Sequence, residues 1–217
     1  MLKKIIILFK LARKIAKSDI LSITSKFQEP PLILKILFKV FSFSFAPKKN
    51  LDISKDEGER LSTSLESMGT TFIKLGQFLA TRPDIIGEEL SKKLENLQDK
   101  LPPFSLSKAK EIIKSDLGEE TFNSIIELSE PVAAASIAQV HKAKINDNGT
   151  IKDVAIKILR PDIKKIFNEE IDAIMLFAFI VESLVKKTRR LKLVEVVFLL
   201  KEITNLEMDL RFEAAAA

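Results

Sequence analysis

Apolar residues recur at helical spacing between residues 51 and 103. One stripe consists of Leu61, Leu65, Met68, Phe72, Leu75 and Leu79. Steps of three and four residues place these side chains on one face, so the pattern predicts an amphipathic helix. Arg82-Pro83-Asp84 ends it, because proline cannot continue a helix and disfavours helix at the preceding residue. A second helix is predicted from about Glu88 to Asp99, before Pro102-Pro103.

The pattern changes after a helix predicted over Ser107 to Leu117, which Gly118 stops. Apolar and polar residues alternate from Ile137 to Ile145, which predicts a strand, and Asp153 to Leu159 is a second strand-like run. The turn residues Asn146 to Thr150 join them into a hairpin. The small residues Pro131 to Ser136 are predicted to form a loop before it. Two long helices are predicted at 162–187 and 193–213.

The amino-acid composition excludes several classes of catalytic and metal site. With 46% hydrophobic and 30% charged residues, a chain of 217 residues is expected to fold around a core. It contains no cysteine and one histidine, His141. Disulfides, thiolate metal sites, a cysteine nucleophile and a His-rich metal site are therefore excluded.

The positive charge gathers at one end. Residues 1–50 hold eleven basic and two acidic residues, a net charge of +9, and the other residues sum to −4. Residues 1–17 are predicted to form a basic amphipathic helix, which can lie in a membrane interface or pack on the body of the protein. The Phe-rich apolar stretch from Leu32 to Phe45 favours the membrane. Nucleic acid fits less well, because these phenylalanines lie within apolar runs rather than among the cations.

A phosphate site is predicted around the hairpin. The small-residue loop lets backbone N–H groups approach a phosphate, and Lys157, in Val154-Ala155-Ile156-Lys157, can reach its oxygens. A carboxylate on a following helix would position that lysine. Protein-kinase N-lobes use this order of parts, with glycine where this chain has alanine. Alanine has less access to positive φ, so a stiffer loop is expected.

Four ordered motifs carry a family resemblance. They are Phe72-Ile73-Lys74-Leu75-Gly76-Gln77, the loop from Ala133 to His141, Lys157, and Glu207-Met208-Asp209. Together they resemble the UbiB family of atypical kinase-like proteins, which includes the ADCK proteins. The first matches the family's KxGQ signature and the last its ExD motif.

The resemblance implies an α+β, mostly helical fold: a protein-kinase-like N-lobe, made of a small antiparallel sheet plus helices, with a helical N-terminal extension. We expect a membrane-facing segment at 1–50, the KxGQ-bearing extension at 51–125 and the N-lobe at 126–217. His-Arg-Asp-like and Asp-Phe-Gly-like stretches are absent from the sequence. The C-lobe is therefore expected to be missing, as in a fragment, a truncated product or half of a split protein.

Site residues follow from the same resemblance. Lys74 and Gln77 would form the KxGQ pair, and Ala133, Ala134, Ala135 and Ser136 would line the nucleotide phosphates. Lys157 would contact phosphate and pair with a carboxylate, for which Glu213 is expected. Glu207 and Asp209 would then face the Lys74 helix. The sequence does not decide between Glu207 and Glu213, because they lie less than two helical turns apart.

The implied function is ATPase-type activity, with ATP or ADP and Mg²⁺, that supports ubiquinone biosynthesis; no Mg²⁺ ligands are assigned in this chain. Some family members carry the older label of a 2-polyprenylphenol hydroxylase, but no flavin motif or iron-ligand set is recognisable. Expected partners are a lipid surface, polyprenyl quinone precursors and other ubiquinone-biosynthesis proteins, at the cytoplasmic face of a membrane. The alternatives are a non-catalytic membrane- or partner-binding module and a helical protein with inert motifs.

Overall fold

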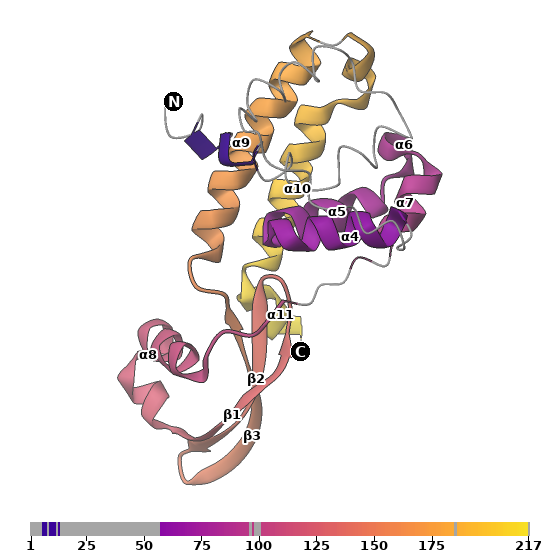
Figure 1. Cartoon of the computed structure of the whole chain (residues 1–217). Helices are drawn as coiled ribbons and strands as arrows, with labels where there is room; N and C mark the ends of the chain where they lie inside the picture. Colours follow the sequence, from indigo (N-terminus) through magenta and orange to yellow (C-terminus); the bar gives the residue numbers. More distant parts are fainter. Residues whose placement is uncertain are drawn as a thin grey trace. The chain divides into compact units, whose positions relative to one another are not determined.

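A computed structural model describes residues 6–7, 9–11, 13, 57–95, 97, 101–184 and 186–216 (Figure 1). The described residues of the predicted N-terminal helix are helical. The rest of that helix and the apolar stretch from Leu32 to Phe45 lie outside the described residues. Within the described ranges, no helix combines the length and apolar character needed to span a membrane.

The chain divides into two compact units that are discontinuous in sequence. The helical unit comprises Met1–Gln98 and Lys164–Glu207, and the sheet unit comprises Asp99–Ile163 and Met208–Ala217. The structure thus groups residues differently from the linear division at 50 and 125 expected from sequence. A chain that leaves one unit and returns to it cannot be recognised from local composition.

Beyond the helical residues described near the N-terminus, the helical unit contains six α-helices and one 3-10 helix among its described residues. They are α4 (Glu57–Met68), α5 (Thr70–Ala80), α6 (Pro83–Ile86), α7 (Glu88–Leu94), α9 (Ile163–Leu184, which enters the unit at Lys164), η1 (Lys186–Leu191) and α10 (Leu193–Glu207). Helices α4, α5 and α7 pack on one another, and α10 contacts α5. Phe72 and Ile73 of α5 are buried in this packing.

The predicted single helix through residues 61–79 is wrong at one position. Gly69 has φ +97°, and it separates α4 from α5. Glycine adopts positive φ without the steric penalty that a side chain imposes, so the break is inexpensive there. The apolar stripe continues across the break, which hides it from a search for periodicity. The next helix, α7, also ends earlier than predicted, at Leu94.

The sheet unit contains α8 (Leu106–Asn123), β1 (Ile125–Ala134), β2 (Ala138–Asp147), β3 (Thr150–Leu159) and α11 (Leu210–Ala216). The strands form an antiparallel sheet in the order β1-β2-β3. Strands β2 and β3 are the predicted hairpin, and its turn residues Asn148 and Gly149 have φ of 53° and 87°. Positive φ at both positions is typical of a tight hairpin turn. Helix α8 is interrupted at Gly118, where a stop was predicted.

Strand β1 corrects the predicted loop at Pro131–Ser136. Residues up to Ala134 pair with β2, and only Ala135, Ser136 and Ile137 connect the two strands. The pairing is irregular between Leu128 and Pro131 and again before Ala133. Proline is tolerated because β1 is an edge strand, where a missing N–H need not break a central ladder. Proline and small residues therefore resembled a loop in the sequence.

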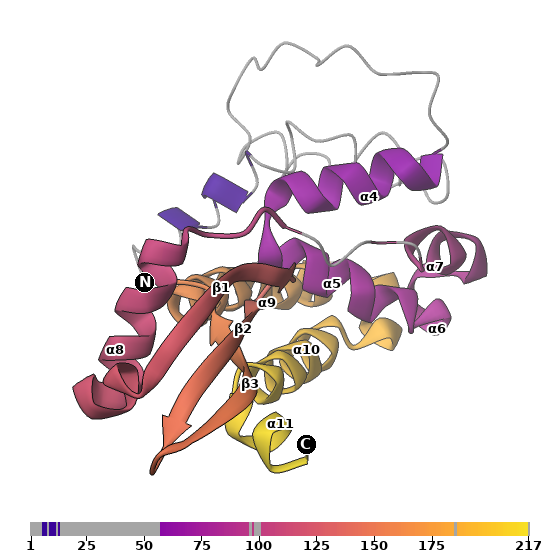
Figure 2. The same ribbon diagram turned by 90° about the horizontal axis from the view of Figure 1, so that it is seen from below.

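Helix α8 covers one face of the sheet. Ala109 and Ile113 of α8 and Ile158 of β3 form the buried centre of this packing. The predicted alternation in β2 is confirmed: Gln139 and His141 are buried, and Lys142 is exposed. Helix α11 lies on the other side of the sheet from α8 (Figure 2).

The predicted helix at 193–213 is two helices. Helix α10 ends at Glu207, and α11 begins at Leu210. The side chain of Asp209 accepts a hydrogen bond from the backbone N–H of Arg211, which satisfies a donor at the start of α11. An aspartate at such a position favours a new helix N-terminus over a continuing helix. The Glu-x-Asp motif therefore spans a helix boundary.

Candidate functional site

Lys157 lies on the edge strand β3, and its side chain is on the sheet face opposite α8, because the next residue, Ile158, packs against α8. In the register of the sheet, Val140 of β2 pairs with Lys157 on one side and with Ala133 of β1 on the other. Residues directly opposite one another in antiparallel strands point to the same face. Across this face, Lys157 is therefore followed by Val140 and then by Ala133, and neither neighbour carries a long or charged side chain.

Glu213 of α11 holds this lysine by a bidentate ion pair. Lys157 Nζ donates to Glu213 Oε1 at 2.8 Å and to Oε2 at 2.6 Å. The side chain of Lys157 is 35% exposed and that of Glu213 is 59% exposed. An exposed pair of this kind leaves the ammonium accessible to a ligand. The pairing of Lys157 with Glu213, which sequence alone left open, is thus resolved by the geometry.

The connection between β1 and β2 ends where β2 begins, at Ala138, two residues before the partner of Lys157 in the sheet, Val140. Ala133 and Ala134 belong to the end of β1, Ala135 lies in the connection, and Ser136 is fully buried. The Ala135 N–H donates to the Ala138 carbonyl at 2.8 Å, which closes the turn. Of the four residues predicted to line phosphates, two are therefore strand residues and two form the turn.

A second lysine–glutamate pair lies in the helical unit. Lys74 Nζ of α5 is 2.9 Å from Glu207 Oε2 of α10. The side chain of Lys74 is only 11% exposed, and that of Glu207 is 42% exposed. This pair joins the KxGQ segment to the last residue of α10, as expected if the Glu-x-Asp motif faces the Lys74 helix.

The neighbours of Lys74 have different environments. Gln77 is half-buried on α5. Gly76 is buried, and an added Cβ would lie 2.5 Å from Cδ2 of Leu97 and 2.8 Å from Cδ1 of Leu65. The missing side chain therefore lets two leucine side chains approach the helix backbone closely. Asp209 accepts two hydrogen bonds from the guanidinium of Arg211, at 2.8 and 2.5 Å.

A buried polar network lies on the α8 side of the sheet. Gln139 Oε1 accepts from the Phe104 N–H at 3.0 Å, and its Nε2 donates to the Phe104 carbonyl at 3.2 Å. His141 Nδ1 is 2.7 Å from the Ser129 carbonyl, and its Nε2 is 2.9 Å from Gln139 Nε2. A carbonyl only accepts, so Nδ1 carries the proton and Nε2 accepts from the amide. His141 is therefore used in holding β1 on β2.

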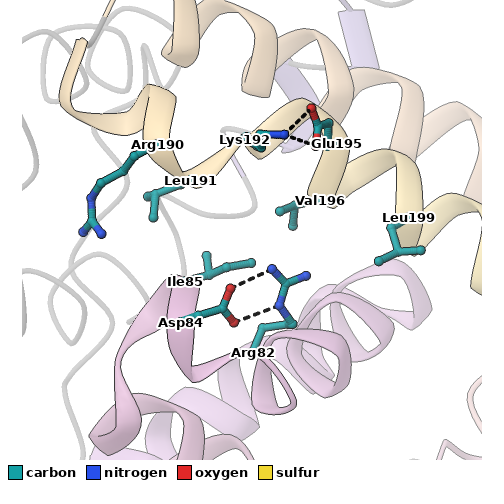
Figure 3. A pocket seen from close by; sticks show the side chains of 9 residues that line it. All are labelled: Arg82, Asp84, Ile85, Arg190, Leu191, Lys192, Glu195, Val196 and Leu199. Atoms are coloured by element: carbon teal, nitrogen blue, oxygen red, sulfur yellow. Dashed lines mark hydrogen bonds and ion pairs between the residues drawn. The ribbon is translucent and has the colours of Figure 1, made fainter.

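The helical unit also has a pocket of about 450 Å³, shown in Figure 3. Its walls are α6, the end of η1 and the start of α10. Arg82 donates to both carboxylate oxygens of Asp84, at 2.8 and 2.7 Å, and Lys192 is 3.0 Å from Glu195. The hydrogen bonds from Arg82 lower the pKa of Asp84 below its ordinary value, against a smaller opposing effect of desolvation. The pocket contains none of the residues predicted to bind nucleotide.

Comparison with known proteins agrees with this geometry. The model of the ABC1 atypical kinase-like domain matches residues 96–217, more than half of the chain. The chain belongs to the ABC1 atypical kinase-like family. The small antiparallel sheet, with Lys157 on β3, is consistent with the N-lobe of such a kinase-like fold.

Curated relatives within the ABC1 family carry the name "Probable protein kinase UbiB". The chain is 37% identical to the protein of Marinobacter nauticus over 190 residues, which cover 87% of this chain and 34% of the relative. It is 40% identical to that of Vibrio cholerae over 171 residues, 78% of this chain and 31% of the relative. The chain thus spans about a third of the length of these relatives. No solved structure matches it.

The ABC1 match covers Lys157, Glu207, Asp209 and Glu213, whereas Lys74 and Gln77 precede it. Among the described residues, no group of three or more histidine, aspartate or glutamate side chains could hold a metal ion. The face around Lys157 fits a nucleotide phosphate chemically, because it offers a cation beside small side chains and a tight turn.

Sequence reasoning missed one residue at this site, Arg160. Its guanidinium donates to the backbone carbonyl of Ala135 in the turn between β1 and β2. The partners are main-chain atoms, which have no signature in the sequence. The only available signal was an arginine directly after the second strand of a predicted hairpin.

Proposed function

We propose that this chain binds ATP or ADP on the sheet unit, as the nucleotide-binding N-lobe of a UbiB-type atypical kinase. Lys157 contacts a phosphate, Glu213 positions Lys157, and the residues from Ala133 to Ser136, at the end of β1 and in the turn after it, line the phosphates. The observation that carries this proposal is the bidentate Lys157–Glu213 pair on the face of the sheet opposite α8. Strand lysines paired with a helix glutamate serve phosphate binding in kinase N-lobes.

The wider role we propose is ATPase-type activity that supports ubiquinone biosynthesis, with Mg²⁺ as the accompanying ion. The UbiB resemblance and the names of the relatives support it. Lys74, Gln77, Glu207 and Asp209 would act as the KxGQ and ExD groups of that activity. The Lys74–Glu207 pair brings one residue of each motif together.

Nucleotide binding is tested with the 217-residue chain and the variant Lys157→Ala, by isothermal titration with ATP and with ADP. Saturable binding by the natural chain, weakened at least about tenfold in Lys157→Ala, is expected because a charged hydrogen-bond donor to phosphate is lost. Lys152→Ala is the matched control, because Lys152 also lies on β3 in an ion pair, with Asp147. Its affinity for nucleotide should equal that of the natural chain.

Two outcomes contradict the proposal. A folded natural chain that binds neither nucleotide would favour the non-catalytic, membrane- or partner-binding alternative. Equal loss of affinity in Lys157→Ala and Lys152→Ala would show that general positive charge, rather than the Lys157 site, attracts the nucleotide.

We further propose that the chain contacts the cytoplasmic face of a membrane peripherally, where polyprenyl quinone precursors and other ubiquinone-biosynthesis proteins would be its partners. The net charge of +9 in residues 1–50 supports contact with anionic lipid. Vesicles containing anionic lipid should sediment the chain, and neutral vesicles should not. Replacing Lys10, Arg13 and Lys14 with glutamine should reduce sedimentation, whereas the same change at Lys108, Lys110 and Lys114 should not. Equal sedimentation with both kinds of vesicle would contradict an electrostatic contact.

A further inference from the structure

Arg160 follows β3 directly and contacts the turn between β1 and β2 with both side chain and main chain. Its Nε and Nη2 donate to the Ala135 carbonyl at 2.9 and 2.7 Å. Its backbone N–H donates to the Ile137 carbonyl at 2.8 Å. Two of the three residues in the turn are thus bound by one arginine.

The same guanidinium reaches the chain segment before α8. Nη1 donates to the Pro102 carbonyl at 3.0 Å, and Nη2 donates to the Leu101 carbonyl at 3.2 Å. Two residues further along this segment, the side chain of Gln139 accepts a hydrogen bond from the Phe104 N–H and donates one to the Phe104 carbonyl. Arg160 therefore joins the turn to a segment that is itself anchored on the sheet.

These contacts restrict the conformation of the turn. A peptide group is planar, so holding the Ala135 carbonyl holds the whole peptide group between Ala135 and Ser136. The bond from the Ala135 N–H to the Ala138 carbonyl fixes the preceding peptide group as well. A planar guanidinium can donate to several carbonyls at once, whereas the ammonium of lysine is a compact, flexible point charge.

We propose that Arg160 is a positioning residue of the nucleotide site: it orders the turn from Ala135 to Ile137 and thereby strengthens nucleotide binding. The inference rests on the proposed function, because it takes the turn to contact the phosphates. Pre-ordering a binding loop raises affinity, since less conformational entropy is lost when the ligand binds.

The ordering itself is tested without any ligand, by amide hydrogen exchange on the 217-residue chain. The Ala135 amide should exchange about tenfold faster in Arg160→Gln, because loss of the clamp permits local opening. Arg160→Lys should give an intermediate rate. Arg189→Gln is the matched control: Arg189 also donates to backbone carbonyls, those of Glu182 and Ser183, but in the helical unit. The Val154 amide of β3 serves as an internal reference for folding, and Arg160→Lys decides the test if Arg160→Gln does not fold.

The effect on the ligand is then measured by titrating ATP into the same proteins. We expect affinity to fall about tenfold in Arg160→Gln, by less in Arg160→Lys, and to be unchanged in Arg189→Gln. Unchanged exchange at Ala135 overturns the proposal. Faster exchange with unchanged ATP affinity overturns it too, because ordering would then have no bearing on binding. If the natural chain binds no ATP, the proposed function fails, and the exchange rates alone decide whether Arg160 orders the turn.

Discussion

The two lysine–glutamate pairs have the same chemistry in different surroundings. Lys74, between α5 and α10, has a side chain that is 11% exposed, whereas Lys157, between β3 and α11, is 35% exposed. Glu213 binds Lys157 through both carboxylate oxygens. Burial strengthens the attraction in an ion pair but also raises the cost of losing one partner. The Lys74 pair is therefore suited to holding helices together, and the Lys157 pair is suited to exchange a protein partner for a ligand.

Exchanging the two charges at the more exposed pair should give the largest effect. In Lys157→Glu with Glu213→Lys, the ion pair can re-form, so stability should recover relative to either single change. ATP affinity should nevertheless stay about 100-fold lower, or ~2.7 kcal/mol, because the cation has moved from β3 to α11. Titration with ATP and urea unfolding of the two single variants and the double variant measure both quantities.

The matched control exchanges Asp147 and Lys152, a pair at the far end of the β2–β3 hairpin. That double variant should bind ATP like the natural chain. Restored ATP binding in the Lys157/Glu213 exchange would contradict the distinction, because it would show that the position of the cation is immaterial.

Replacing each lysine with methionine should lower the free energy of unfolding by a different amount at the Lys74–Glu207 pair than at the Lys157–Glu213 pair. Lys74→Met should lower the free energy of unfolding by about 1–2 kcal/mol, because Glu207 keeps its charge beside a largely buried site. Lys157→Met should cost less than about 1 kcal/mol, as expected of exposed pairs. Urea unfolding at neutral pH and high salt measures both. Equal losses would contradict the assignment of different roles.

The smallest expected effect is on the pH dependence of stability, and it involves one aspartate in each unit. The pKa of Asp84 is lowered by hydrogen bonds from Arg82, and that of Asp147 is lowered by a hydrogen bond from Lys152. A lowered folded-state pKa stabilises the fold above the unfolded pKa, near ~4, and this contribution is lost as pH falls through the folded value. Asp84→Asn and Asp147→Asn should therefore be less stable than the natural chain at pH 7, and the difference should vanish at low pH. A difference that persists in acid would contradict the ion pairs as its source.

Much of the sheet unit could be predicted from sequence, because its signals are local. The alternation around Gln139 and His141, the turn at Asn148-Gly149 and the stop at Gly118 all depend on neighbouring residues. Lys157 could be placed on a strand for the same reason. Its ion pair with Glu213 agreed with an expectation from family resemblance, although spacing alone did not distinguish Glu213 from Glu207.

What sequence missed depends on contacts between distant segments. The end of β1 resembled a loop because its pairing with β2, rather than its own residues, makes it a strand. The break at Gly69 was hidden because the apolar stripe stays in phase through it. The contact of Arg160 with Ala135 could not be foreseen, since any residue supplies a backbone carbonyl.

The network of Gln139 and His141 has a consequence for how the sheet assembles. A strand that slips by one residue turns every side chain to the opposite face. In a slipped β2, the amide and imidazole would lose Phe104 and Ser129, and lysines would enter the space beneath α8. Two buried polar side chains thus select the correct strand register. They raise the free energy of mispaired folding intermediates more than they stabilise the native sheet.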